Sequence, residues 1–291
     1  MNAATLTRAE SLAATLPPLL VAAERVANTV AQGVHGRRRV GQGDSFWQFR
    51  AAQPGDSARE IDWRQSARAD RLYVRQTEWE AAQTICLWRD CGARMRWRSP
   101  LGAETKQARA DVLLLALAAL LLRAGERVRL VAPGLPEFSG RAGLARLAAT
   151  LAATPDSETM PDAALLPRYA NVVLVGDMLA PMEEIAACLS GLAARPVQAH
   201  LVQVLDPAEQ SLPYEGRVLF APIAGGPTEL VANVAELRPA YVARLAAQRA
   251  AIGDLCAGAG FGFQTHATDA PATAALMALA AAMAPDAVAR R

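Results

Sequence analysis

From Gln83 onward, short apolar runs alternate with stretches of helical periodicity, and this alternation restricts the possible folds more than any other feature. The apolar runs include TICLWRD, RVRLVA, NVVLVGDM and VQAHLVQVLD. Helical stretches lie between them, among them residues 104–123 and PMEEIAACLSGLAA, which has a proline at its start. Strands and helices in this order predict an α/β fold with a doubly wound, mostly parallel sheet and helices on both faces.

The two ends of the chain depart from this pattern. Residues 1–36 are expected to form one or two helices, and RLYVRQTE alternates as a strand should. In the final third, GRVLFAPI and ELVANVAE predict a late β-hairpin, followed by a helix from Pro239 to about Cys256, the strand GFGFQTHAT and a last helix. We expect an N-terminal extension over residues 1–80, whose Arg/Trp-rich block packs on the main domain, and an α/β domain over residues 81–291.

The composition excludes several classes of protein. Lys106 is the only lysine, so a Walker-type phosphate loop is absent. The four cysteines show no CxxC spacing and the three histidines lie far apart, which argues against a zinc site. The net charge of +2 gives no general attraction to nucleic acid. No segment reaches the ~20 apolar residues of a membrane span, so we expect a cytoplasmic protein without an integral membrane segment.

Two carboxylates follow apolar strands, Asp90 after TICLWR and Asp177 after NVVLVG. In a doubly wound sheet the strand ends form the ligand crevice at one edge, so this pair could hold a hard cation such as Mg²⁺. Alternatively, each acid caps the helix that follows it, and periodicity alone favours this second interpretation.

Cys91, beside Asp90, raises the alternative of a nucleophile in a hydrolase. A reactive thiolate needs a neighbouring base or a positive field, and Arg89 and Arg94 supply only the field. No histidine lies in this segment. A loop cysteine without catalytic function is therefore the favoured interpretation.

The stretch GDSAREIDWRQSARADRLYVR is the densest in charged and aromatic side chains. Arginine and aromatic residues are enriched at interface hot spots, which suits a contact surface for another protein. A network of salt bridges that fixes the extension to the sheet domain is the other interpretation, and nucleic acid is a weaker third because acids interrupt the basic stripe. The predicted partner-binding residues are Arg59, Asp62, Trp63, Arg64, Ser66, Arg68 and, outside the stretch, Arg94.

Four stretches resemble the domain of unknown function 58 family, and the resemblance covers nearly the whole chain from about Leu16. They are GDSFWQFRAAQPGDSAREIDWRQSARADRLYVRQTEWE, VVLVGDML, VLDPAEQSLPYEGRV and FQTHATDAPATAALMAL. The resemblance implies a von Willebrand factor A-like fold with a metal-ion-dependent adhesion site at the carboxyl edge of the sheet. It also implies partnership with MoxR-type AAA+ ATPases in assembly, maturation or stress-related roles.

The adhesion-site pattern of that fold, carried onto this chain, is incomplete. Asp90 takes the first aspartate position and Asp177 the late one, whereas the two serine positions fall on Gly92 and Arg94. The loop after RVRLVA offers only Ser139 as a hydroxyl. At most two of the usual five side-chain ligands remain, so we expect a degenerate metal site, no cofactor, and Arg94 paired with Asp90 or Asp177 in place of Mg²⁺.

These observations favour a non-enzymatic interaction module that acts as an adaptor for a MoxR-type AAA+ ATPase and binds no nucleic acid. The alternative is a hydrolase that uses Cys91 or a metal held by Asp90 and Asp177.

Overall fold

A computed structural model describes most of the chain. The described residues are 7, 40–53, 57, 61–68, 71–78, 84–132, 134–155, 159–223 and 225–283. The helices predicted within residues 1–36 lie outside this set, apart from Thr7.

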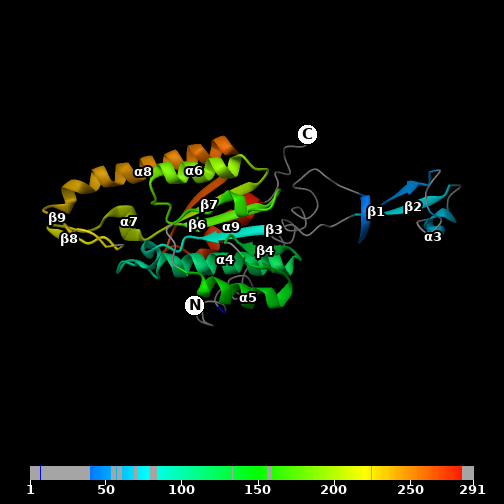
Figure 1. Cartoon of the computed structure of the whole chain (residues 1–291), viewed down its shortest axis with the longest axis horizontal. Helices are drawn as coiled ribbons and strands as arrows, with labels where there is room; N and C mark the ends of the chain where they lie inside the picture. The colour runs from blue at the N-terminus through cyan, green and yellow to red at the C-terminus, as the bar shows by residue number, and fades with distance from the viewer. Residues whose placement is uncertain are drawn as a thin grey trace.

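A six-stranded sheet forms the centre of the α/β domain (Figure 1). Across the sheet the strands are β10 (Gly262–Ala267), β7 (Gln198–Leu205), β6 (Asn171–Gly176), β3 (Thr84–Arg89), β4 (Arg127–Leu130) and β5 (Glu137–Phe138). All neighbours pair in parallel except β4 and β5, which are antiparallel. The prediction of a doubly wound, mostly parallel sheet is therefore confirmed, with a short antiparallel strand added at one edge.

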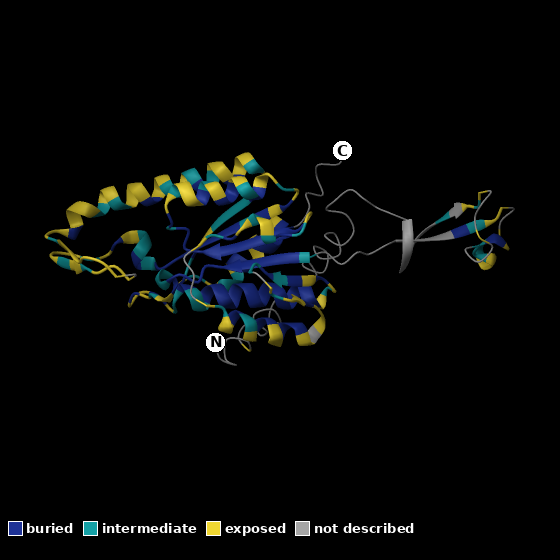
Figure 2. Ribbon diagram, in the orientation of Figure 1, coloured by how far each residue is buried: buried dark blue, intermediate teal, exposed yellow. Residues whose placement is uncertain are grey.

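Helices cover both faces of this sheet, because successive residues of the buried strands point to opposite sides. Ile85 and Leu87 of β3 pack into a core with α4 (Lys106–Arg123), α5 (Gly140–Ala153) and α9 (Ala272–Met283). Cys86 and Trp88 point the other way, toward α6 (Met182–Ala193) and α8 (Val234–Ala259). Figure 2 shows the result as a dark, buried sheet between helices that expose their outer sides.

The late hairpin is confirmed by β8 (Val218–Phe220) and β9 (Glu229–Val231), which pair antiparallel. The boundary after it was wrong, because α8 begins at Val234 and contains Pro239 rather than starting there. Asn233 explains the earlier start, since its side chain accepts a hydrogen bond from the Ala235 N–H at 3.2 Å and caps the helix.

The Arg/Trp-rich block contains a second, smaller sheet. Here β1 (Val40–Ala51) pairs antiparallel with β2 (Tyr73–Glu78), and the short helix α3 (Trp63–Ser66) precedes β2. Figure 1 draws these elements at one end of the molecule, beyond the amino end of β3. Residues 79–83, which join them to β3, are outside the described set, and packing of this block on the main domain stays a prediction. No helix in the described part of the chain has the length and hydropathy to cross a membrane.

Candidate functional site

The candidate site lies where β3 and β6 adjoin at the centre of the sheet. The chain leaves β3 toward β4 on one side and leaves β6 toward β7 on the other, which makes this the topological switch point of the sheet. Asp90 and Asp177 follow these two strands directly. The Asp90 N–H donates to the Val175 carbonyl at 2.9 Å, so the backbone hydrogen bonds between β3 and β6 continue as far as Asp90.

Gly176 allows the two strand ends to approach this closely. A Cβ atom at Gly176 would lie 2.8 Å from the Cβ of Asp90, closer than real Cβ contacts. The residue after Asp177 is also unusual, because Met178 has a φ of 52° in the left-handed region. A non-glycine residue held there stores strain, a feature that clusters at functional sites.

Each carboxylate bonds first to its own loop. Asp90 Oδ1 accepts from the Gly92 N–H at 2.8 Å, and Asp177 Oδ1 accepts from the Leu179 N–H at 2.9 Å. Both bonds span two residues, which is the Asx-turn geometry. The acids therefore close their own turns and leave their second oxygens to the crevice. The interpretation that each caps the following helix was wrong, because the N-cap residues of α4 and α6 are Thr105 and Pro181.

Lys106 supplies the principal cation of the crevice, and sequence reasoning did not assign it to the site. It is the first residue of α4, its side chain is fully buried, and its Nζ lies 3.1 Å from Asp177 Oδ2. The same Nζ lies 2.5 Å from Glu209 Oε1. The signal was present in the sequence, since a chain otherwise rich in arginine keeps one lysine at the start of an apolar helix.

Glu209 is placed by the turn that follows β7. Asp206 accepts from the Ala208 N–H at 2.9 Å, while Glu209 Oε2 accepts from the Asp206 N–H at 2.8 Å, which forms a capping box at α7 (Pro207–Ser211). Ser99 adds a hydroxyl bond of 2.5 Å to Asp206. The DPAEQ stretch thus fixes the carboxylate that faces Lys106.

Arg94 is the second cation at the crevice. Its Nε lies 3.4 Å from Asp177 Oδ2, and its side chain is 31% exposed. The expected pairing of Arg94 with a strand-end acid is therefore with Asp177. This Nε is buried and donates no hydrogen bond within the described part of the chain, so its link to Asp177 is an ion pair.

Asp90 carries the least compensated charge of the group. Burial and then the charge of Asp177 raise the pKa of this carboxyl, and the Gly92 N–H, Arg94 and Lys106 offset only part of the shift. Burial also raises the pKa of Glu209 although Lys106 lies beside it. The crevice is thus electrostatically crowded with acids and holds its cations tightly.

The residues present do not fit a magnesium ion. Gly92 has no side-chain oxygen, Arg94 is itself a cation, and Lys106 already occupies Asp177 Oδ2. Ser139 lies at the opposite edge, because β5 runs antiparallel to β4 and pairs Phe138 with Val128 near the amino end of β4. Among the residues that the structure describes, no group of three or more His, Cys, Asp or Glu is placed to hold a metal.

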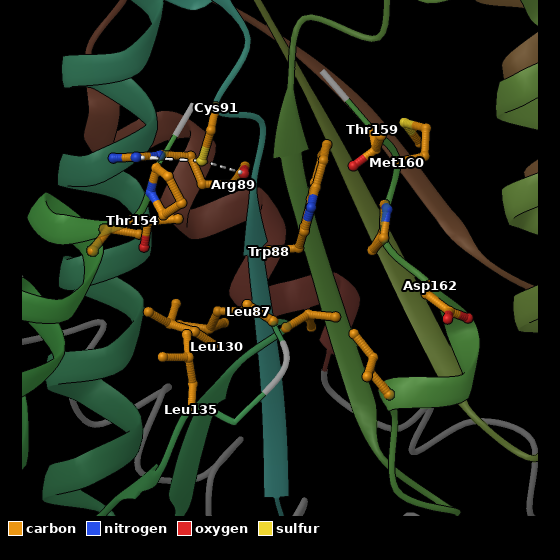
Figure 3. A pocket seen from close by; sticks show the side chains of 16 residues that line it. Leu87, Trp88, Arg89, Cys91, Leu130, Leu135, Thr154, Thr159, Met160 and Asp162 are labelled. Atoms are coloured by element: carbon orange, nitrogen blue, oxygen red, sulfur yellow. Dashed lines mark hydrogen bonds between the residues drawn. The ribbon is translucent and has the colours of Figure 1, made fainter. Parts of the chain in front are cut away.

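Cys91 has a structural environment (Figure 3). Its Sγ lies 3.3 Å from the Arg89 carbonyl, to which it donates, and 3.4 Å from Arg89 Nη2, from which it accepts. Arg89 is itself buried and bonds Asp111 of α4 at 2.5 Å. No described histidine is bonded to the thiol, which offers no support for the alternative of a nucleophile.

The predicted partner-binding block divides into supporting and exposed residues. Asp62 caps α3 by accepting from the Gln65 N–H at 2.9 Å, and the buried Ser66 hydroxyl accepts from the Tyr73 N–H at 2.9 Å. Trp63 is 61% exposed, and Arg64 and Arg68 are exposed as well. Arg59 lies outside the described residues.

The structure brings Asp90, Asp177 and Arg94 together, but not the Arg/Trp-rich block with them. The block leads into the amino end of β3, whereas the crevice opens at its carboxyl end. These are therefore two separate candidate surfaces.

Comparison with known proteins gives a family and uncharacterised relatives. A family model described as "Protein of unknown function DUF58" matches residues 48–251. The uncharacterized proteins Rv1480 of Mycobacterium tuberculosis and Mb1516 of Mycobacterium bovis are each 27% identical over 276 residues, which is 89% of this chain and 85% of theirs.

Two solved structures are similar at a low level. They are the conserved hypothetical protein BatB from Bacteroides thetaiotaomicron and an aerotolerance-related membrane protein from Bacteroides fragilis. Both have a TM-score of 0.42 and cover 69% of this chain, with 12% and 13% identity over 97% and 98% of their own length.

Proposed function

This chain belongs to the DUF58 family, and on that premise we propose that it is a non-enzymatic protein-interaction module with a von Willebrand factor A-like fold. It acts in the cytoplasm as an adaptor for a MoxR-type AAA+ ATPase, in assembly, maturation or stress response. The resemblance of its sequence motifs to that family is the reason for choosing this partner.

One observation carries the proposal. The fully buried Lys106 ammonium stands between Asp177 and Glu209, where an adhesion-type domain would need a metal cation to neutralise its strand-end acids. A fixed ammonium neutralises the acids without free coordination positions, so it supports a binding surface rather than metal-dependent chemistry. In this proposal the cation that neutralises the acids is a side chain of the protein, so no cofactor is needed.

In this proposal Arg94 is the residue that binds the partner. In adhesion-type binding the metal captures a carboxylate of the partner, and a guanidinium can do the same through two parallel N–H···O bonds. Arg94 is anchored on its inner side by Asp177 and is partly exposed on its outer side. The loop continues with exposed Arg96 and Arg98, and no acid occurs in the sequence between Asp90 and Glu104.

A pull-down with the MoxR-type ATPase of the same organism tests this function, with ATP, ADP and no nucleotide. The wild-type chain is expected to retain the ATPase in at least one nucleotide state. Arg94→Gln is expected to weaken that binding at least tenfold, whereas Arg123→Gln, an exposed change at the end of α4, leaves it unchanged. Absence of binding in every nucleotide state would contradict the proposed partner.

A further inference from the structure

A mostly apolar cavity that is partly open to solvent lies beside the crevice, where β4 ends before β3 does. The last β3–β4 pair is Leu87 with Leu130, followed by one bond from the Val131 N–H to the Leu87 carbonyl. Among the described residues, Trp88 and Arg89 continue β3 without a strand partner on that side. Described residues between α5 and β6, namely 154–155, 159–162 and 165, line this gap, and the cavity has a volume of about 390 Å³ (Figure 3).

The lining of the cavity is mostly apolar. Figure 3 shows Leu130 and Leu135 on one side, and Trp88 and Met160 on the other. The polar lining is divided: Arg89 and Cys91 bond each other near the crevice, whereas the other polar lining residues, Thr154, Thr159 and Asp162, lie elsewhere on the wall. A volume in the range of ~300–1,000 Å³ with apolar walls and few polar groups is typical of a ligand pocket.

The cavity and the basic loop are neighbours along the chain. Cys91 forms part of the wall, and Arg94 follows three residues later, which is at most about 10 Å of extended chain. The partly exposed Arg94 and the exposed Arg96 and Arg98 give the outer surface of this loop a positive charge. An apolar pocket beside a guanidinium is complementary to a segment that carries an apolar side chain next to a carboxylate.

We propose that this cavity is a docking pocket for an acidic, apolar peptide segment of a protein partner. The apolar side chain enters between Leu135 and Met160, and the adjacent carboxylate binds Arg94. The cavity supplies the affinity through apolar burial, while the arginine supplies orientation and the encounter rate. This inference rests on the proposed function, because it names the chemistry that the adaptor recognises at the same edge of the sheet.

The test uses fluorescein-labelled dodecapeptides with one central Leu, Met, Phe or Trp flanked by Glu, measured by fluorescence polarisation with the full chain. Matched peptides replace either the Glu residues by Gln or the central residue by Ala. We expect binding by the acidic, apolar peptides and at least tenfold weaker binding by both matched series. Equal binding of the Ala series would overturn the pocket.

Variants of the protein locate the binding. Ala132→Phe and Leu135→Trp fill the cavity from the segment between β4 and β5, and each is expected to weaken binding at least tenfold with an unchanged urea midpoint. Ala187→Phe, an exposed position of α6, is the matched control. If Arg94→Gln abolishes binding while both filling variants bind normally, the crevice recognises the partner and the cavity does not.

Absence of binding by all peptides at 1 mM also overturns the pocket. Retention of the ATPase in the pull-down, which does not depend on these peptides, then shows whether the proposed function survives.

Discussion

The Lys106 ammonium lies 3.1 Å from the Asp177 carboxylate, and neither side chain reaches solvent. Burial of two charges is costly, and the cost is offset here because Lys106 also contacts Glu209 while the Asp177 turn bonds its second oxygen. The pair joins the start of α4 to the end of β6. It therefore connects the two chain segments that form the crevice.

Removal of the lysine is expected to leave the buried Asp177 and the partly buried Glu209 without their cation. Lys106→Met should lower the free energy of unfolding by about 3–5 kcal/mol, the range for breaking a buried pair from one side. Urea unfolding measures the loss, and Arg123→Met, on the exposed end of the same helix, serves as control. A loss below about 1 kcal/mol would mean that the acids are neutral or hydrated in the wild type.

Divalent metal is expected to have no effect on the wild-type chain, since Lys106 holds the position that a cation would take. A thermal-shift titration with Mg²⁺ and Mn²⁺ should show no saturable stabilisation. Arg94→Ser alone should behave in the same way, because this partly exposed arginine leaves Lys106 in place. Saturable stabilisation of the wild type would disprove the replacement of metal by side-chain cations.

Asp90→Asn is expected to stabilise the protein at pH 8. Burial, and then the charge of Asp177, raise the pKa of Asp90, so its ionised form is disfavoured in the folded state, and asparagine keeps the acceptor for the Gly92 N–H. The advantage should shrink as the pH falls through the raised pKa, because the wild type then gains its proton preferentially in the folded state. Urea midpoints across pH measure this.

Asp254→Asn, an exposed change on α8, is the control for that series. A less stable Asp90→Asn protein at pH 8 would show that attraction to Lys106 and Arg94 outweighs the burial of the charge.

His266 is expected to make the fold sensitive to mild acid. Its Nε2 lies 2.8 Å from Arg109 Nη1, and burial together with this guanidinium lowers its pKa to about 4. The unfolded chain binds the proton first, so stability should fall between about pH 6.5 and 4, by up to about 3 kcal/mol, and level off below. Urea unfolding in steps of pH measures this loss.

His266→Gln should reduce the fall over that pH range, while His200 and the acids contribute equally to both proteins. An identical pH profile for the two would show that His266 does not titrate in this range.

Much of the fold was predictable because apolar periodicity reports burial directly. TICLWR and NVVLVG are buried along nearly their whole length and became β3 and β6, which put Asp90 and Asp177 at one edge. The start of α8 was missed because ELVANVAE reads as a strand, while the Asn233 cap acts through a single local bond.

The contacts of the site were less predictable than its location. Lys106 is sixteen residues beyond Asp90 along the chain, and the bonds that matter join it to residues 71 and 103 positions away. A motif lists positions along one segment, whereas a buried charge is balanced by whatever the fold brings near it. Arg94 lay inside the motif and could be found. The pairing of Lys106 with Glu209 could not, because the fold brings the first residue of α4 to a residue of α7 that is far away in the sequence.

The buried position of Lys106 makes its amine a chemical reporter of whether the crevice is open or closed. It is the only side-chain amine in the chain, and it is fully buried. Amine-directed reagents, acetylating enzymes and lysine-specific proteases therefore meet no accessible lysine while the crevice is closed. Any event that pulls α4 away from β6 would expose that amine, so the rate of lysine labelling, followed by mass spectrometry, reads the opening of one defined place in the molecule.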